Sequence, residues 1–253
     1  FDKNIFKSRN RIFSILLKRA TAVICESNEG YSKLIKEYNL SPNRLHISNL
    51  YSPLIDHKYL KTNISKSNDE LYLLYPAAFW PHKNHVYLIF ALSIILEKLP
   101  NLRLKFTGSE NEHSKYIFQV AKELNVEKNV DFMNFQSLES LRKYICNSLA
   151  MVYPSYLWPS NIPPLEALSN NCPVFVGNSE ESKAFLGSSV YYFDYCNPNS
   201  LAEKVIKLYE NGRSKEDIKL SKKFILEYMK NKSLKETLSR ILKIYNWKKI
   251  TWQ

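Results

Sequence analysis

The chain has 253 residues, of which 45% are hydrophobic and 13% aromatic, so it can bury a core and is not a disordered chain. It contains only five glycines and neither GxGxxG nor GxxxxGK, which removes the main signature of P-loop and dinucleotide-binding proteins. The formal net charge of +12 fits an anionic partner such as nucleic acid, an acidic membrane surface or a phosphorylated substrate, and equally fits a solvated basic surface.

The first fifty residues predict a small helix and strand unit. Helices are expected over 12–19 and 29–39, and strands over 20–27 and 44–48. Two strands are too few to close an independent sheet, so we expect residues 1–50 to be the end of a domain whose beginning is missing. Residues 51–68 are polar and poorly periodic, which is typical of a linker.

From residue 69 onward, short apolar runs alternate with amphipathic helices. The expected strands are 71–76, 102–108, 129–135, 149–154, 172–177 and 189–194. The expected helices are 85–99, 115–126, 138–148, 163–170, 198–211, 214–229 and 231–246. Continuous apolar runs separated by helices predict βαβ units and a parallel sheet that is buried on both faces.

The cysteines and the apolar stretches exclude several other classes of protein. The four cysteines form no CxxC pair and have no histidine at ligand spacing, so we expect neither zinc nor a disulfide framework: Cys25, Cys146, Cys172 and Cys196. No apolar stretch approaches ~20 residues and no signal peptide is visible. We therefore expect a protein of the reducing cytoplasm.

The stretch WPSNIPPLEAL (158–168) predicts a helix start that faces a phosphate. Pro163 and Pro164 suit the first helical positions because their missing N–H groups would be unpaired there. Ser160 or Asn161 can cap the helix, and the remaining N–H donors belong to Asn161, Ile162, Leu165 and Glu166. A helix start after a buried parallel strand carries partial positive charge at the edge of the sheet where ligands bind.

Glu166 does not suit a phosphate, because its charge would repel one at close range. A hydroxyl-bearing group such as ribose suits it better, with both carboxylate oxygens as acceptors. The alternative is that Glu166 only stabilises its own helix start, which is worth ~0.3–1 kcal/mol.

Several segments in order along the chain resemble glycosyltransferase family 4, the retaining enzymes of the GT-B fold. PSYLWPSNIPPLEALSNNCPVFV resembles the signature segment of that family, and YPAAFWPHKNH (75–85) resembles its phosphate-binding segment. LRLKFTG, NVDFMNF and SVYYFDYCNPNSLAEKV lie where the family has its other donor-domain strands and turns. KRATAVICES and YNLSPNRLHISN resemble the last strands of its N-terminal domain.

The resemblance implies an α/β fold of GT-B type, with a Rossmann-like domain whose parallel sheet is flanked by helices and a partial second Rossmann-like domain. It implies that residues 1–66 are the end of the acceptor domain and a linker. Residues 67–230 would be the nucleotide-sugar donor domain. Residues 231–253 would be a helix that crosses back to the N-terminal domain.

Site residues follow from the resemblance one at a time. Lys83 matches the lysine that contacts the donor diphosphate, and Glu166 matches the second acid of the paired-glutamate signature, which holds the ribose. The amides after Asn161, with Ile162 and Leu165, match the helix start that faces the phosphates. Gly108, at the end of strand 102–108, is expected in the donor site.

Two positions depart from the family pattern. Trp158 replaces the first acid of the pair, and Ala78 replaces a phosphate-binding arginine. His82, Asn84, Trp158 and Asn161 are candidates for the lost contacts. The alternatives are that His82 is a surface histidine before a helix and that Trp158 is a packing aromatic.

The implied activity is transfer of a sugar from a nucleoside-diphosphate sugar to an acceptor hydroxyl with retention, in the synthesis of bacterial surface polysaccharide or lipopolysaccharide. No cofactor and no metal is expected. The expected partners are the donor and a glycan or lipid-linked glycan acceptor, with peripheral contact at the inner face of the membrane and no nucleic acid.

We expect the chain alone to transfer little, because most of the acceptor half is absent. Two other classes stay open, a relic that binds the nucleotide sugar without catalysis and a basic nucleic-acid-binding protein. The latter lacks any RRM, KH or helix-turn-helix pattern.

Overall fold

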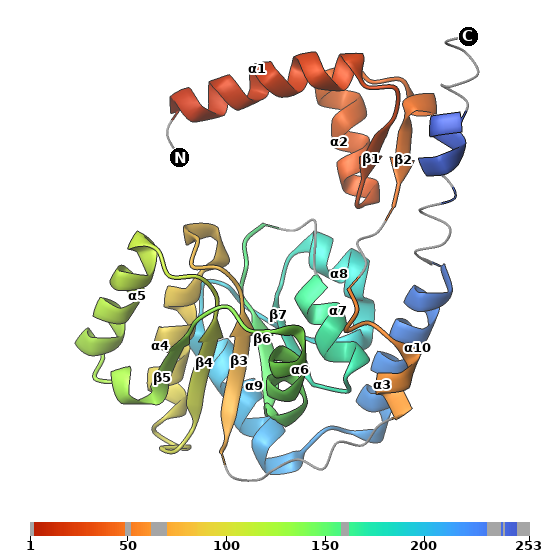
Figure 1. The fold of residues 1–253 in the computed structure, drawn as a ribbon. Coiled ribbons are helices and arrows are strands. Elements are labelled where there is room, and N and C mark those ends of the chain that lie inside the picture. Colours follow the sequence, from red (N-terminus) through yellow and green to blue (C-terminus); the bar gives the residue numbers. More distant parts are fainter. Residues whose placement is uncertain are drawn as a thin grey trace. The chain divides into compact units, whose positions relative to one another are not determined.

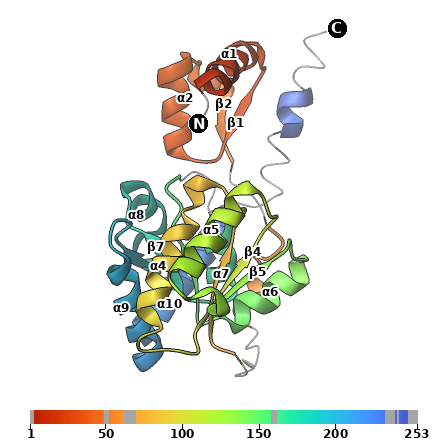
Figure 2. The ribbon, with the colours of Figure 1, turned by 90° about the vertical axis from the view of Figure 1, so that its left-hand side faces the viewer.

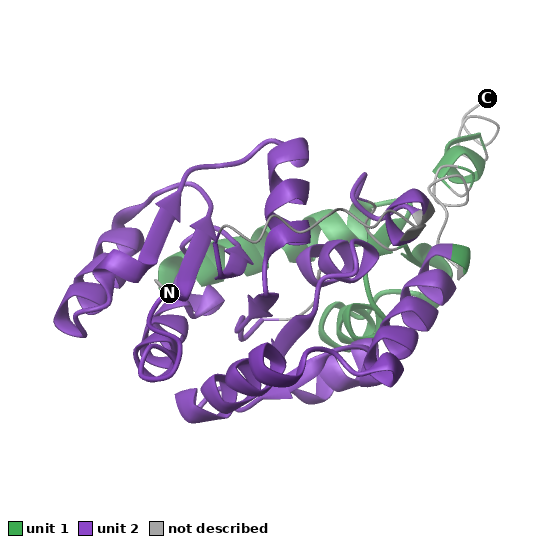
Figure 3. Ribbon diagram, turned by 90° about the horizontal axis from the view of Figure 1, so that it is seen from below, with its two compact units in different colours: residues 1–51, 230–253 green, residues 52–229 purple. Residues whose placement is uncertain are grey.

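A computed structural model describes residues 3–48, 52–61, 70–157, 162–231, 239 and 241–246. The chain divides into two compact units, shown in green and purple in Figure 3. Unit 1 comprises residues 1–51 and 230–253, and unit 2 comprises residues 52–229. Of the predicted last helix, 231–246, only 231, 239 and 241–246 belong to the described residues, and these are helical.

Unit 1 has the predicted order of helix, strand, helix and strand. Its elements are α1 (Lys3–Arg19), β1 (Val23–Cys25), α2 (Asn28–Tyr38) and β2 (Leu45–Ile47). The two strands pair in parallel. Ser27 caps α2 by accepting the amide of Gly30 at 3.0 Å, and the guanidinium of Arg44 donates to carbonyls at the end of α1.

Unit 2 is built on a six-stranded sheet in which every neighbouring pair is parallel, as predicted. The strand order is β5-β4-β3-β6-β7-β8. Their bounds are β3 (Tyr72–Pro76), β4 (Arg103–Thr107), β5 (Val130–Met133), β6 (Ala150–Tyr153), β7 (Val174–Gly177) and β8 (Tyr191–Phe193). All four residues of β6 and of β7 are buried, which explains why they read as continuous apolar runs.

Helices cover both faces of this sheet (Figure 1). They are α3 (His57–Lys61), α4 (His85–Ile95), α5 (Glu112–Glu123), α6 (Leu138–Asn147), α7 (Ile162–Ser169), α8 (Glu180–Leu186), α9 (Pro198–Asn211) and α10 (Lys215–Asn231). In Figure 2 the strands lie between α4 and α9 on one side and α6 on the other. Within the described ranges, none of the helices combines the length and apolar composition that a bilayer crossing requires.

The short helix α8 was not predicted, although its start carries a local signal. Ser179 and Ser182 form a reciprocal capping box, in which each hydroxyl accepts the amide of the other residue at 3.0 Å. Seven residues between two strands are too few to show a clear helical periodicity, so the capping box is the clearer sequence signal for this helix.

The segment predicted to be a linker, 51–68, differs from that interpretation in its described part. Residues 52–61 belong to unit 2 and contain α3, and the side chains of Leu54 and Ile55 are buried in its core. The segment is polar overall, and its few apolar residues follow neither a helical nor a strand period. Its packing depends on α7, which lies more than a hundred residues further along the chain.

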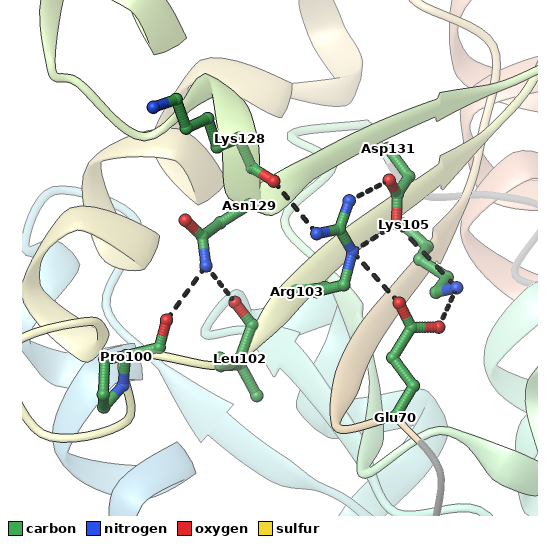
Figure 4. Close-up of polar contacts among 8 residues, drawn as sticks. All are labelled: Glu70, Pro100, Leu102, Arg103, Lys105, Lys128, Asn129 and Asp131. Carbon is green, nitrogen blue, oxygen red and sulfur yellow. Dashed lines mark hydrogen bonds and ion pairs between the residues drawn. The ribbon is translucent and has the colours of Figure 1, made fainter.

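An ion-pair network ties the amino-terminal half of β4 to its neighbours (Figure 4). Arg103 contacts the carboxylates of Glu70 and Asp131, and Lys105 contacts the same two carboxylates. The ammonium of Lys105 also lies 4.7 Å from the ring centre of Tyr72. These partly exposed pairs give modest stability, and they lie at the edge of the sheet away from the carboxyl ends of the strands.

Candidate functional site at the carboxyl edge of the sheet

The strand order places a topological switch point between β3 and β6. From β3 the chain adds β4 and β5 in one direction, and from β6 it adds β7 and β8 in the other. In open parallel sheets of this order, ligands bind in the crevice outside the carboxyl ends of the two strands where the direction reverses. The segments that follow these strands are 77–84 after β3 and 154–161 after β6.

Lys83 ends a 3-10 turn, Pro81–Lys83, in the segment between β3 and α4. The hydroxyl of Tyr75 donates to the carbonyl of Lys83 at 2.8 Å, which fixes the backbone at this position. The Nζ of Lys83 donates to the hydroxyl of Tyr153 at 3.3 Å and lies 5.5 Å from the centre of that ring. Because Tyr153 ends β6, the ammonium spans the switch point from β3 to β6.

The electrostatics of Lys83 suit an incoming anion. Burial lowers the pKa of its ammonium, because the charged form loses hydration there. Among the residues that the structure describes, no carboxylate forms an ion pair with it; its described partner is the neutral hydroxyl of Tyr153. A phosphate next to this group would supply the missing counter-charge and would raise the pKa again.

His82 joins the two segments at the switch point. Its carbonyl accepts the amide of Tyr156 at 3.0 Å and the hydroxyl of Ser155 at 3.4 Å. Its half-buried imidazole has a pKa lowered by burial and by the charge of Lys83. The backbone of His82 therefore holds Ser155 and Tyr156, in the segment after β6, next to Lys83.

The predicted helix start is present, because α7 begins at Ile162. In the first turn the N–H groups of Ile162 and Leu165 have no intrahelical acceptor, and Pro163 and Pro164 have no N–H. The side chain of Leu165 is buried, so only its backbone can face a ligand. Trp158 and Asn161 lie outside the described residues.

Glu166 is buried, with 6% of its surface exposed. Its Oε1 accepts a hydrogen bond from the hydroxyl of Ser52, a contact that no local pattern in the sequence predicts. Burial raises the pKa of Glu166, and the bond from Ser52 opposes that rise. A ribose hydroxyl would therefore share Oε1 with Ser52 or use Oε2, which differs from the predicted pair of unoccupied acceptors.

Asn84 follows Lys83 in the left-handed conformation, with φ of 55°. Asparagine tolerates this conformation better than most residues, which explains its presence between the 3-10 turn and α4. Its side chain is 9% exposed, and its Nδ2 has no hydrogen-bond partner within the described part of the chain. The conformation thus accounts for the residue type, and the amide group remains a candidate ligand contact.

Gly108 lies at the end of β4, next to the segment after β3. A Cβ at this position would lie 2.6 Å from the carbonyl oxygen of Ala77, so only glycine lets the two backbones approach. Its position at the carboxyl edge agrees with a donor-site residue, and the contact gives it a packing role as well.

Sequence reasoning missed three residues that position the predicted ones: Tyr75, Tyr153 and Ser52. The two tyrosines occupy the ends of buried strands, where an aromatic residue reads as core. Tyr153 is 1% exposed, and burial raises its pKa to about 12, so its hydroxyl stays protonated. In the described ranges, no group of three or more His, Cys, Asp or Glu side chains is arranged to hold a metal ion.

Comparisons with known proteins identify a family and a fold for this chain. A family model described as "Glycosyl transferases group 1" matches residues 56–225, which include Lys83 and Glu166. A curated relative, the O-antigen chain mannosyltransferase RfbU of Salmonella typhimurium, is 26% identical over 170 residues, covering 66% of this chain and 45% of its own. The chain thus spans about half the length of that relative.

Solved structures share the fold at low sequence identity. Sucrose-phosphate synthase of Thermosynechococcus elongatus has a TM-score of 0.75 at 17% identity, covering 97% of this chain and 62% of its own. A mutant of TarM from S. aureus was solved with fondaparinux, alpha-GlcNAc-glycerol and UDP. It has a TM-score of 0.74 at 15% identity, covering 95% of this chain and 46% of its own. Anabaena Alr3699/HepE in complex with UDP has a TM-score of 0.74 at 15% identity, covering 93% of this chain and 66% of its own. The predicted α/β fold of GT-B type is confirmed.

Proposed function

Because the chain belongs to the glycosyl transferases of group 1, we propose that it is a retaining glycosyltransferase of family 4 that takes its sugar from a nucleoside diphosphate. The observation that carries this proposal is Lys83, a half-buried ammonium at the switch point between β3 and β6. In unit 2, Lys83 and the start of α7 belong to segments that follow these two strands, where a parallel sheet of this order binds its ligand.

The proposed mechanism uses charge that develops on the leaving diphosphate. As the bond between the sugar and the phosphate breaks, negative charge grows on the phosphate oxygens. The ammonium of Lys83 and the N–H groups of Ile162 and Leu165 stabilise that charge more strongly than the charge of the intact donor. Tyr75 and Tyr153 hold Lys83 from its carbonyl and its Nζ, so little reorganisation is needed during the reaction.

Recognition of the nucleoside is assigned to Glu166. Its carboxylate accepts hydrogen bonds from the ribose hydroxyls, while the hydrogen bond from Ser52 keeps Oε1 oriented. The buried position makes this acceptor strong, because few water molecules compete with the sugar. His82, Asn84, Gly108, Trp158 and Asn161 are proposed as further donor contacts.

The sugar is proposed to be a hexose and the acceptor a glycan or lipid-linked glycan of a bacterial surface polysaccharide. The curated relative is named an O-antigen chain mannosyltransferase, and two of the structural neighbours were solved with UDP. No metal or other cofactor takes part in the proposed reaction.

Contact with the inner face of a membrane is proposed through α1. This helix carries six cationic side chains and no acidic one: Lys3, Lys7, Arg9, Arg11, Lys18 and Arg19. Large apolar side chains such as Phe6 and Leu16 are exposed on it. A basic amphipathic helix of this kind suits an anionic lipid surface. Sedimentation with vesicles containing phosphatidylglycerol, compared with phosphatidylcholine alone, tests this contact.

The experiment that tests the function is a binding panel followed by turnover. Calorimetry with UDP, GDP, dTDP and their sugars should give one preferred base, and a ligand at ~100 times its Kd should stabilise the chain by about 2.7 kcal/mol. Turnover of the preferred donor, with the anomeric configuration of the product read by NMR, tests transfer and retention. Turnover would exclude the non-catalytic relic, the alternative that Ala78 in place of the family arginine suggests.

A further inference from the structure

The segment after β8, residues 194–197, carries no predicted role, yet it reaches the switch point. Tyr87 of α4 donates its hydroxyl to the carbonyls of Asp194 and Asn197, at 2.8 Å and 3.0 Å, and its ring stacks on Phe193. Tyr87 is buried, so the segment is attached firmly to the core of unit 2.

Tyr195 extends from this segment across the end of β7. Its ring occupies the place of a side chain at Gly177, where a Cβ would lie 1.9 Å from the ring. The hydroxyl of Tyr195 donates to the carbonyl of Ser155 at 3.4 Å, and its ring packs on that of Tyr156 with centres 5.6 Å apart.

The contacts of Ser155 and Tyr156 continue toward Lys83. Ser155 is fully buried, and its hydroxyl bridges the carbonyls of Leu157 and His82. The amide of Tyr156 donates to the carbonyl of His82, the residue before Lys83. A continuous set of contacts therefore runs from residues 194–197 after β8, through residues 155–157 after β6, to His82 and Lys83 after β3.

We propose that Tyr195 is a positioning residue for the donor site: it holds residues 155–157, and through His82 the backbone at Lys83, in the conformation that meets the diphosphate. This inference rests on the proposed function. Tyr195 needs no contact with the nucleotide, because displacing the ring shifts the segments that do contact it, and small displacements of such groups cost much affinity and rate.

The test compares nucleotide affinity of the wild-type chain with three variants, using whichever of UDP, GDP and dTDP binds best. Tyr195→Ala should raise Kd by about tenfold, or ~1.4 kcal/mol. Tyr195→Phe should stay within about threefold, because the ring contacts remain and the lost 3.4 Å bond is weak. Gly177→Ala should resemble Tyr195→Ala, since the added methyl displaces the ring.

The combination of substitutions separates positioning from general damage. Gly177→Ala should add nothing in the Tyr195→Ala background, because the clash it creates has been removed. Tyr209→Ala, at an exposed tyrosine on α9, is the matched control and should leave Kd unchanged. Hydrogen exchange should accelerate in Tyr195→Ala at the amides of 83 and 156 and stay slow in β3.

Two failures are distinguishable. If wild type binds and Tyr195→Ala and Gly177→Ala bind equally well, or if exchange accelerates evenly across unit 2, the role of Tyr195 is overturned while the proposed function stands. If the wild-type chain binds none of the three nucleotides, the proposed function fails and the role of Tyr195 fails with it.

Discussion

At the scale of single residues, the charged groups of the candidate site are buried more deeply than their residue types favour. Lys83 is half-buried and Glu166 is buried. Burial lowers the pKa of Lys83 and raises the pKa of Glu166, so it favours the neutral form of each side chain. Keeping such groups costs stability, so a protein that retains them for function can be stabilised by replacing them. His85 is a third titratable group that is buried in unit 2.

Lys83→Ala should weaken binding of a nucleoside diphosphate by ~1.5–3 kcal/mol, the range of a charge-assisted hydrogen bond. It should barely change binding of the free nucleoside, which lacks phosphate. Because burial lowers the pKa of Lys83, affinity should also begin to fall at a lower pH than the ordinary lysine value of ~10.4 would give. Calorimetry across pH measures both effects.

The matched control for Lys83 is Lys115→Ala, which removes an exposed ammonium from α5. Equal weakening by the two substitutions would assign the effect to net charge and would contradict a phosphate contact at Lys83.

Glu166→Ala should weaken the binding of ribonucleotides more than the binding of their deoxy analogues. Glu166→Gln should lose less affinity because one acceptor oxygen survives.

The free energy of unfolding should change in the opposite direction, because replacing Glu166 should stabilise the fold. Burial raises the folded pKa of Glu166 above its unfolded value of 4.5, so the folded state binds the extra proton and stability falls as pH rises through this range. Glu166→Gln should therefore be more stable than wild type at pH 7, as measured by urea unfolding without nucleotide.

A Glu166→Gln protein that is less stable at pH 7 and binds ribose normally would show that Glu166 serves only its own helix. Ser52→Ala offers a second check, because it removes the donor to Oε1 and should raise the pKa of Glu166 further.

His85 should make the fold sensitive to acid. Its ring is fully buried against Tyr75, Phe79 and Phe106, and burial lowers its pKa to about 3. The unfolded chain binds this proton near pH 6.5, so stability is intact above that pH and is lost as pH falls toward 3. Urea unfolding between pH 4 and 7 should show a steeper loss for wild type than for His85→Phe; parallel curves would count against this assignment.

At the scale of elements, the carboxyl edge depends on close approach between the ends of neighbouring strands. Gly108 lets β4 meet the segment after β3, and Gly177 leaves room for a ring beside β7. The amino-terminal half of the sheet is held differently, by the ion pairs of Arg103 and Lys105. The two edges can therefore be perturbed separately.

Gly108→Ala should destabilise unit 2 by about 1–3 kcal/mol, the cost of forcing a methyl into a packed site. The added Cβ would lie 2.6 Å from the carbonyl oxygen of Ala77, and the segment that carries Lys83 must shift to relieve this clash. Nucleotide affinity should fall together with stability. Chemical unfolding and calorimetry on the same samples measure the two quantities.

Asp131→Asn is the control at the opposite edge, where it weakens the contacts of Arg103 and Lys105. It should lower stability and leave nucleotide affinity unchanged. If Asp131→Asn reduces affinity as much as Gly108→Ala does, the loss at Gly108 reflects global destabilisation.

At the scale of the whole molecule, the boundary between the two compact units lies earlier in the chain than composition suggests. Ser52 donates to Glu166, the amide of Asp56 donates to Ser169, and Leu54 and Ile55 are buried. Residues 52–61 are thus part of the unit that carries the candidate site, and they hold α7 in particular.

A fragment of residues 52–229 should therefore fold and bind nucleotide, whereas a fragment of 67–229 should be much less stable. The shorter fragment loses Leu54 and Ile55, each worth about 1.5–3 kcal/mol when fully buried, and leaves Glu166 without Ser52. Thermal unfolding of the two fragments measures the difference. Equal melting temperatures would restore the boundary at 67 that the sequence predicts.

The sequence by itself determined the order of the longer helices and of the strands in both units, the parallel sheet, the turn after β3 that carries Lys83, and a helix start beside Pro163. These features depend on local patterns, since apolar periodicity, prolines and helix caps act over a few residues. The missed elements, α3 and α8, are short, and short segments carry little periodicity.

Only the tertiary structure decided how the site is held. The strand order set the switch point between β3 and β6, and it brought Ser52 to Glu166 across 114 positions of sequence and Tyr195 to Ser155 across 40. A serine or a tyrosine at such a position looks ordinary in the sequence, because its partner is fixed by long-range packing and not by neighbours along the chain. Local motifs therefore placed the candidate charged groups along the chain, while the contacts that position those groups could not be predicted from them.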